Sequence, residues 1–495
     1  MSEAPDRVII VGAGNAALVT ALAVHETGAR PLVLEAAPRA ERGGNSRFAG
    51  ATFRFAHDGL EDLTELLDAS SLDLVPHSSV GPFTREDFYE DLMSTSDGRA
   101  DREHARVLVE ESRDTIAWMR DHGVRWELAT RKFLRPDQLG PDRPYVLPPG
   151  ACVRAVHEGI GLTDDLFAAV EAAGIEVRYG TPASDLITDG TRVLGVVAGG
   201  PDGREELRGQ VVLASGGFEA NPELRLRYLG EGWDLVKVRG SRFNRGRMLE
   251  AALRAGAMAT GHWGGCHATP VAADAPDVGS LALTDSTARH SYPYGILVNR
   301  RGERFVDEGE QYYLSTYAKT GAAIRAQPGA WAVQIFDQRT LDVLQPRYAT
   351  QEPVTAGTIV DLARALGLPA EALQRTVDEF NAAVTGDPVL FDANVEDGLH
   401  TKGVVPPKSN WAMPIDEPPF VAYPVTAGIT FTYGGLATDV QGRVLDDQGR
   451  PMPGLHATGE ITGGLFFHNY PGGSGLMRGA VFGRRAALSA VTALG

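Results

Sequence analysis

A chain of 495 residues, 43% of them hydrophobic, is long enough to bury a large core divided between two or three domains. Its formal net charge of −17 argues against nucleic acid and against an anionic membrane surface as partners. The two cysteines, Cys152 and Cys266, form no CxxC pair, so neither a disulfide framework nor a metal site is expected.

The first residues, MSEAPDR, are polar and carry no secretory signal. No apolar run reaches the ~18 residues that a membrane-spanning helix needs. We therefore expect a globular, cytoplasmic protein without a transmembrane segment.

Residues 7–37 have the pattern of a strand, a tight turn, a helix and a second strand. The turn, GAGNAA, matches the dinucleotide fingerprint G-x-G-x-x-A. In this fingerprint Gly12 makes the turn, Gly14 lets a pyrophosphate approach the backbone, and Ala17 keeps the helix close to the sheet. Glu35 ends the second strand, where a carboxylate accepts hydrogen bonds from ribose hydroxyls. The segment therefore predicts a bound dinucleotide.

Three further glycine-rich stretches indicate which dinucleotide is bound. RGGNS occupies residues 42–46, and ASGG at 214–217 and ATGE at 457–460 each follow an apolar strand. One of them alone could be an ordinary strand-end turn. Together they favour FAD, whose isoalloxazine must be seated beyond the pyrophosphate, with the Glu460 carboxylate on the ribityl hydroxyls. A plain NAD-dependent dehydrogenase would leave these loops without a role.

These motifs, with GERFVDE at 302–308, resemble the FAD flavoproteins of the fumarate reductase and succinate dehydrogenase superfamily. Within it the chain is most similar to the tricarballylate dehydrogenase type, through stretches such as RGSRFNRG and TKGVVPPKSNWA. The resemblance covers essentially the whole chain. It implies an α/β fold with a Rossmann-like FAD-binding domain of the glutathione reductase type (1–261 and 431–495). An α+β capping domain (262–430), with a helical pattern from Thr358 to Val384, interrupts it.

The resemblance also implies how the cofactor is held. RGGNSRFAG contains no histidine to which a flavin could be attached, so noncovalent FAD is expected. In the family, the loop HNYPGGSGLMRG at 468–479 wraps the pyrimidine edge of the flavin, and Gly475 and Leu476 begin a helix whose positive end faces it. The predicted cofactor contacts are Gly12, Gly14, Asn15, Ala16, Ala17, Glu35, Ala36, Arg42, Gly43, Gly44, Asn45, Ser46, Ala183, Ala214, Ser215, Gly216, Gly459, Glu460, Ser474, Gly475 and Leu476.

The chain departs from fumarate reductases at the predicted active site. Their proton-delivering arginine, eight residues after the arginine of G-x-R-F-x-x-E, corresponds to Tyr312. Their carboxylate-binding arginine in the C-terminal loop corresponds to Tyr470, and one of their histidines corresponds to Phe431. The upstream histidine is kept as His267 and is expected to contact the substrate. A succinate or fumarate reaction of the usual kind is therefore not expected.

Tyrosines at these two positions also resemble 3-ketosteroid Δ1-dehydrogenases, in which one tyrosinate takes a proton and another tyrosine polarises the carbonyl. The implied chemistry is α,β-dehydrogenation, or the reverse reduction, of a CH–CH bond next to a carboxylate or carbonyl. We expect Tyr470 to donate to the substrate oxygen and take Tyr312 as a candidate proton acceptor. Of Tyr312 and its neighbour Tyr313, one is expected to pack in the core.

A tricarballylate-like polycarboxylate is the expected substrate, and it requires fixed cations. Arg289 and Arg242 are the candidates, although each could be a solvated surface residue. The alternatives are an apolar ketone of the ketosteroid kind and a non-catalytic flavin-binding protein. The sequence does not indicate which electron acceptor or donor is the partner.

Overall fold

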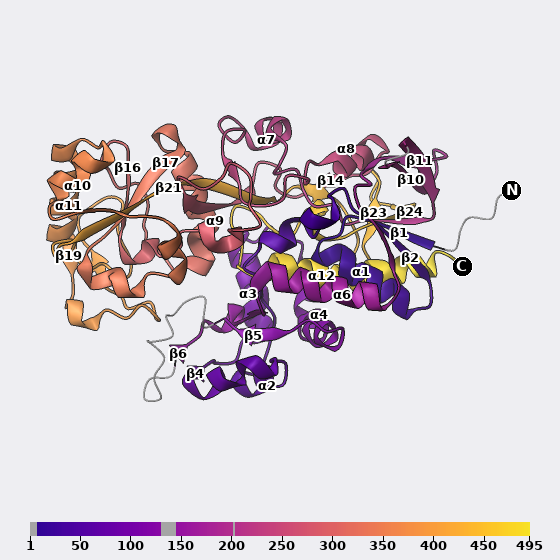
Figure 1. The fold of residues 1–495 in the computed structure, drawn as a ribbon, viewed down its shortest axis with the longest axis horizontal. Coiled ribbons are helices and arrows are strands. Elements are labelled where there is room, and N and C mark those ends of the chain that lie inside the picture. The colour runs from indigo at the N-terminus through magenta and orange to yellow at the C-terminus, as the bar shows by residue number, and fades with distance from the viewer. Residues whose placement is uncertain (1–6, 130–144, 201–202) are drawn as a thin grey trace.

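The computed structural model describes residues 7–129, 145–200 and 203–495. Figure 1 shows an elongated molecule with a different β-sheet toward each end. Each of these two sheets has six strands. The sheet nearer the two termini carries the predicted cofactor loops, and the other belongs to the predicted cap.

The first sheet is largely parallel, with strand order β23-β24-β12-β1-β2-β8. Its central strand β1 (Arg7–Val11) pairs with β2 (Arg30–Leu34) on one side and with β12 (Gln210–Leu213) on the other. The chain order therefore reverses at β1, and ligand crevices form beyond the carboxyl ends of the strands at such a point. The sheet is completed by β8 (Glu176–Arg178), β24 (Pro451–Ala457) and the antiparallel β23 (Arg443–Leu445).

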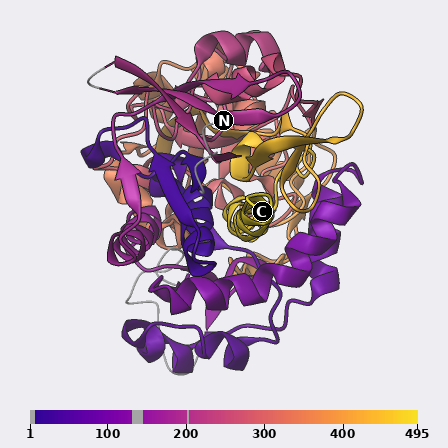
Figure 2. The same cartoon turned by 90° about the vertical axis from the view of Figure 1, so that its right-hand side faces the viewer.

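The predicted strand–turn–helix–strand unit is confirmed, and its helix packs against the C-terminal helix. Figure 2 looks along α12 (Ser474–Thr492), which contacts α1 (Asn15–Glu26) and α4 (Arg102–Asp121). A Cβ added to Gly483 would lie 3.0 Å from both Ala16 O and Thr20 Oγ1. The small residues of α12 therefore let the two helices approach closely, and this contact joins the two ends of the chain.

The second sheet is organised by one long strand, β21 (Phe420–Thr432). It pairs with strands from four separate segments: β13 (Lys237–Val238), β15 (Cys266–Ala272), β17 (Trp331–Phe336) and β18 (Val354–Ala356). The edge strand β16 (Ile296–Asn299) pairs with β17. The helix α9 (Tyr313–Arg325) packs on β15 and β21.

The predicted helical pattern is present as α10 (Ile359–Leu366) and α11 (Ala370–Ala383). The two are separate because Gly367 ends α10 in the left-handed conformation and Pro369 follows. β13 lies within the predicted first cofactor segment yet pairs with β21, which crosses the predicted boundary at residue 430. The domain limits 1–261, 262–430 and 431–495 thus remain a prediction.

The remaining α-helices and strands complete the described fold. They are α2 (Leu60–Thr64), α3 (Arg85–Thr95), α6 (Glu158–Ala172), α7 (Pro222–Leu229), α8 (Arg247–Arg254), β3 (Thr52–Phe53), β4 (Ser78–Ser79), β5 (Trp126–Leu128), β6 (Tyr145–Val146), β7 (Val153–Ala155), β9 (Ala183–Thr188), β10 (Val193–Gly200), β11 (Gly203–Arg208), β14 (Ala259–Thr260), β19 (Val384–Thr385), β20 (His400–Thr401) and β22 (Gly435–Leu436). Across residues 7–129, 145–200 and 203–495, no helix combines the length and apolarity needed to cross a bilayer.

Candidate active site

A cavity of about 300 Å³ opens beyond the carboxyl ends of β1, β2 and β12. Bare backbone is sterically required on its wall. Gly12 has φ +110°, and a Cβ there would lie 2.4 Å from Ala214 O. Gly216 has φ +73°, and its Cβ would lie 2.4 Å from the Asn244 side-chain nitrogen. The cavity therefore has the shape that the dinucleotide fingerprint requires, with the N-terminus of α1 facing it.

Glu35 stands at the end of β2 and lines this cavity. Its carboxylate accepts a hydrogen bond from the Ala37 N–H at 2.7 Å. Only 5% of the residue is exposed, and burial raises the pKa of the carboxyl from 4.5 to about 6. Such a desolvated carboxylate is suited to accept hydrogen bonds from a ribose.

A second cavity of about 180 Å³ adjoins the first and shares Asn15, Asn45 and Glu460 with it. Glycine loops from both chain ends form part of its wall, and the cap sheet and α9 supply the rest. The cap side is mainly aromatic, with His267, His290, Tyr313, Tyr317 and Phe431. The two cavities together match an extended FAD that runs from the fingerprint to a substrate space.

Asn45 and Glu460 connect the cofactor loops. The Asn45 side chain donates to Glu219 Oε1 and to Thr430 O, each at 2.6 Å. Glu460 accepts from the Thr432 N–H at 2.9 Å. Burial and the adjoining Glu460 carboxyl raise the pKa of Glu219 well above its usual range, because two carboxylates cannot both ionise cheaply in an apolar site.

Most of the predicted cofactor contacts line one or both cavities. These are Gly12, Gly14, Asn15, Ala16, Glu35, Ala36, Gly44, Asn45, Ser46, Ala183, Ala214, Ser215, Gly216, Gly459, Glu460, Gly475 and Leu476. Four others lie beside them. Ala17 is buried inside α1, and Ser474 is the first residue of α12, where its hydroxyl donates to Pro471 O. Arg42 pairs with Glu171, and Gly43 forms the turn before Gly44.

Tyr470 lies in the second cavity at the N-terminus of α12. Its hydroxyl oxygen accepts hydrogen bonds from the Gly475 N–H at 2.9 Å and the Gly473 N–H at 3.2 Å. Burial raises the pKa of this tyrosine, while the two N–H donors lower it in part. Since both donors come from the backbone, the oxygen is fixed in place and the O–H hydrogen is left to be donated elsewhere.

His267 lies on β15 and packs against three rings of the same cavity. Its ring centroid lies 4.7 Å from that of Tyr317 and 5.1 Å from those of Phe431 and Tyr470. Burial lowers the pKa of His267 well below 6.5, so the imidazole is neutral at physiological pH. Its Nδ1 has no hydrogen-bond partner among the described residues.

The other three predicted site residues lie outside the two cavity linings. Tyr312 is the N-cap of α9 and packs against Tyr313, which does line the second cavity. Arg289 is 1% exposed and donates to backbone carbonyls and to Gln351 within the cap. Arg242 is a surface residue paired with Glu41. Tyr312 precedes the helix with non-helical backbone angles (φ −54°, ψ 138°), whereas Tyr313 is the first helical residue, so the two side chains do not share one face.

Sequence reasoning did not single out Arg239, Asp285 or Tyr317, which all line the second cavity. Arg239 lies in RGSRFNRG, the segment in which Arg242 was favoured. The sequence signal that could have indicated Arg239 is its position directly after the apolar Val238. Val238 ends β13, and this strand brings Arg239 to the second sheet. Asp285 lies in a short 3-10 helix (Thr284–Thr287) without a motif, and the sequence gives no signal for it.

A comparison with known protein families identifies the group to which these loops belong. The family model described as "FAD binding domain" matches residues 7–476. This chain is a member of that FAD-binding family. It is an FAD-dependent oxidoreductase that acts on CH–CH groups, as its family and relatives are. The predicted FAD cofactor is confirmed at this level.

Similar proteins of the family act on chemically different substrates. A probable fumarate reductase of Shewanella frigidimarina is 28% identical over 97% of this chain and 74% of its own length. A 3-oxosteroid 1-dehydrogenase of Mycolicibacterium smegmatis is 30% identical over 67% of this chain and 62% of its own. A 4-oxocyclohexanecarboxylate 2-dehydrogenase of Sinomonas cyclohexanicum is 31% identical over 65% of this chain and 57% of its own. These relatives extend beyond the part that this chain matches.

Solved structures confirm the α/β fold. An open flavocytochrome c3 fumarate reductase superposes with a TM-score of 0.71 at 24% identity, over 99% of this chain and 78% of that one. A 3-ketosteroid Δ1-dehydrogenase from Sterolibacterium denitrificans superposes with a TM-score of 0.74 at 20% identity, over 98% and 100%. At these identities the likeness establishes the fold alone.

Proposed function

We propose that this flavoprotein dehydrogenates, or in reverse reduces, the CH–CH bond next to a carbonyl or carboxyl group of a small substrate held in the second cavity. The observation that carries the proposal is the hydroxyl of Tyr470. Two backbone N–H groups at a helix N-terminus fix its oxygen, and its hydrogen is left to bind a substrate oxygen. A donor fixed in this way stabilises the enolate-like charge that develops as the α-proton leaves.

The proton acceptor that the cavity supports best is His267. Burial holds the pKa values of Tyr313 and Tyr317 well above 10, so these tyrosines are protonated at neutral pH and cannot accept a proton. His267 is neutral, and its ring packs on that of Tyr470. Burial also raises the pKa of the sequence-based candidate Tyr312, at the start of α9 next to the cavity-lining Tyr313, so this tyrosine ranks second as acceptor.

FAD, when bound, supplies the oxidant by accepting hydride from the β-carbon of the substrate. The residues that would hold it are those of the glycine loops around Gly12, Asn45 and Glu460. On the other side of the cavity, the aromatic cap residues exclude water from the reacting carbons.

The lining favours a substrate with fewer charges than a tricarboxylate. Two arginines, Arg239 and Arg478, line the second cavity, and the Asp285 carboxylate beside Arg239 offsets one of the two positive charges. A substrate that combines one carbonyl with one carboxylate matches this supply of charge, and 4-oxocyclohexanecarboxylate, on which one relative acts, has that combination. The tricarballylate-like substrate predicted from the sequence is the second candidate, supported by Arg478 as a further cation.

Anaerobic bleaching of the FAD-loaded protein tests this proposal. The panel contains 4-oxocyclohexanecarboxylate, tricarballylate, succinate and a 3-ketosteroid, each with its unsaturated product offered to the chemically reduced protein. We expect the keto acid to bleach the flavin or its product to reoxidise it. If every member of the panel leaves the flavin spectrum unchanged in both directions, the proposal is wrong.

A further inference from the structure

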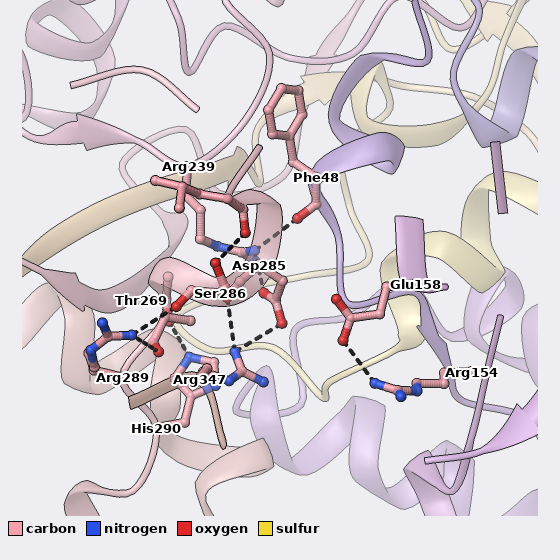
Figure 3. Close-up of polar contacts among 12 residues, drawn as sticks. Phe48, Arg154, Glu158, Arg239, Thr269, Asp285, Ser286, Arg289, His290 and Arg347 are labelled. Carbon is pink, nitrogen blue, oxygen red and sulfur yellow. Dashed lines mark hydrogen bonds and ion pairs between the residues drawn. The ribbon is translucent and has the colours of Figure 1, made fainter. Parts of the chain in front are cut away.

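A buried cluster of three charges stands at the cap side of the substrate cavity. Arg239 Nη1 donates to Asp285 Oδ1 at 2.6 Å, and Arg347 Nη1 donates to Asp285 Oδ2 at 2.9 Å. The three side chains are 9%, 5% and 8% exposed. Figure 3 shows both guanidinium groups directed at the one carboxylate. Two cations share one anion, so the cluster carries one excess positive charge.

Arg239 is the cluster arginine that lines the cavity and still has a donor left over. Its Nε donates to Thr430 Oγ1 at 3.2 Å, and its Nη1 also donates to Phe48 O at 3.3 Å. Its Nη2 donates to no residue in the described part of the chain, although Arg239 lines the cavity. Because Arg239 lines the cavity, this nitrogen is available to an acceptor that a ligand supplies, and a carboxylate is the acceptor that a guanidinium binds most strongly.

The neighbouring charges Arg154, Glu127 and Glu158 carry one net negative charge, and Glu158 acts on Arg347, the cluster member that does not line the cavity. Beyond Arg347 lies the Arg154–Glu158 pair, in which Arg154 also binds Glu127. None of these three residues lines the cavity, whereas Arg239 and Asp285 do. The positive charge of Arg239 is also felt by its neighbours, because it contributes to lowering the pKa of His267. A ligand anion would therefore meet the cluster at Arg239.

We propose that Arg239 binds a carboxylate of the substrate through its free Nη2 edge, and that Asp285 and Arg347 are positioning residues that hold Arg239 in place. The inference rests on the proposed function and adds a substrate class: a small acid with a carboxylate at Arg239 and an activated oxygen at Tyr470. Arg239 is thereby assigned as the cation that binds the substrate carboxylate. The two arginines predicted from the sequence do not supply this cation, because Arg289 is bonded within the cap and Arg242 lies on the surface.

The test compares an acid with its uncharged ester. Perturbation of the reduced-flavin spectrum in the chemically reduced, anaerobic protein, which a saturated ligand cannot bleach, gives Kd values for 4-oxocyclohexanecarboxylate and its methyl ester. For Arg239→Gln we expect the Kd of the acid to rise roughly 10- to 150-fold, because a charge-assisted hydrogen bond is lost, while the Kd of the ester stays within about twofold. Arg239→Lys should restore part of the preference for the acid.

Arg242→Gln is the matched control, since it removes a neighbouring surface arginine and should leave both Kd values unchanged. Asp285→Asn separates positioning from net charge. Removing an anion should by itself tighten binding of the acid, whereas loss of positioning weakens it. We expect weaker binding of the acid, unchanged binding of the ester and unchanged FAD content.

The inference is overturned if Arg239→Gln keeps the wild-type ratio of the two Kd values, if Arg242→Gln changes that ratio as much, or if wild type does not prefer the acid. These outcomes differ from failure of the proposed function. If the keto acid bleaches the flavin but the ratio of the two Kd values does not depend on Arg239, the proposed function stands. In that case only the assignment of Arg239 as the carboxylate-binding residue is wrong.

Discussion

At the residue scale, the hydroxyl of Tyr470 has the most specific environment in the site. Its two hydrogen bonds come from residues three and five positions later, so the tyrosine and the start of α12 form one rigid unit. The surrounding glycines leave few other side chains near the substrate oxygen. In the proposed reaction, this hydroxyl group is the hydrogen-bond donor to the substrate oxygen.

Removing that hydroxyl should slow the reaction without damage to the fold. Tyr470→Phe should retain FAD and reduce its flavin about 10²–10³-fold more slowly, since that is the usual effect of deleting an oxyanion donor. Single-turnover stopped flow with 4-oxocyclohexanecarboxylate measures the rate. Tyr228→Phe, which alters a tyrosine outside both cavity linings, is the control. A wild-type rate in Tyr470→Phe would show that the residue only packs.

The assignment of His267 as proton acceptor predicts a characteristic pH profile. Because burial holds its pKa well below 6.5, the imidazole stays neutral as the pH falls from 8 through 6.5. The rate of flavin reduction should be flat across that window, and His267→Gln should lower it about 10²–10⁴-fold. Burial raises the pKa of Tyr312 above 10, so a rate that instead rises as the pH passes above 10, and loses that rise in Tyr312→Phe, would give the role to the tyrosine.

Glu35 makes the stability of the FAD-free protein depend on pH. Its folded pKa of about 6 lies above the unfolded value of 4.5, so the folded state binds this proton more tightly. The contribution is present below pH 4.5 and is lost as the pH rises through 6, a change of roughly 2 kcal/mol. Urea unfolding of wild type and Glu35→Gln should show it as a difference that shifts in favour of the variant between pH 4.5 and 7. A pH-independent difference would contradict it.

At the scale of elements, the contact between α1 and α12 decides whether the two cofactor-binding ends of the chain meet. Gly479 and Gly483 face Ala16 and Thr20 at distances that leave little room for a larger side chain. The phosphate loop before α1 and the Tyr470 loop before α12 are thereby held together. The spacing of the two helices thus sets the geometry of the cofactor site.

Gly483→Val should separate these helices. The Cβ of the new side chain alone would lie 3.0 Å from Ala16 O. Overpacking should therefore lower the free energy of unfolding by about 1–3 kcal/mol and weaken FAD retention. Leu488→Ala on the same helix is the control, because Leu488 is 56% exposed. Thermal unfolding and the fluorescence of released FAD measure the two effects. Equal FAD retention and stability in Gly483→Val and wild type would show that the helices tolerate a wider spacing.

At the scale of the whole molecule, FAD should act as a structural element, since its predicted contacts come from both ends and the middle of the chain. FAD at 1,000 times its Kd should add about 4 kcal/mol to the free energy of unfolding. Differential scanning calorimetry of stripped protein with and without FAD measures this, with NAD as the control ligand. Gly12→Val should abolish the increase, because its Cβ would meet Ala214 O at 2.4 Å. An equal increase with NAD would contradict the choice of cofactor.

Local sequence by itself determined the structure of the cofactor-binding segments. The strand, turn and helix of residues 7–26 and the glycine loops follow from short-range rules, in which only glycine tolerates the required φ angle or the close backbone approach. Those rules favoured FAD, whereas Tyr470 and His267, which line the substrate cavity, were proposed from the family resemblance. The resemblance also placed the start of α12 at Gly475, one residue after its first residue Ser474.

Only the tertiary structure decided which cations and which tyrosines face the substrate cavity. The sequence alone does not distinguish among three arginines, Arg239, Arg242 and Arg289, because each stands in a segment rich in polar residues. Pairing of β13 with β21 turns Arg239 toward the cavity, while backbone carbonyls of the cap bind Arg289 and solvent surrounds Arg242. Tyr312 and Tyr313 differ by one position at the start of α9, and it is the packing of that helix on β15 that gives Tyr313 the cavity. Long-range strand pairing sets these orientations, and no local pattern encodes them.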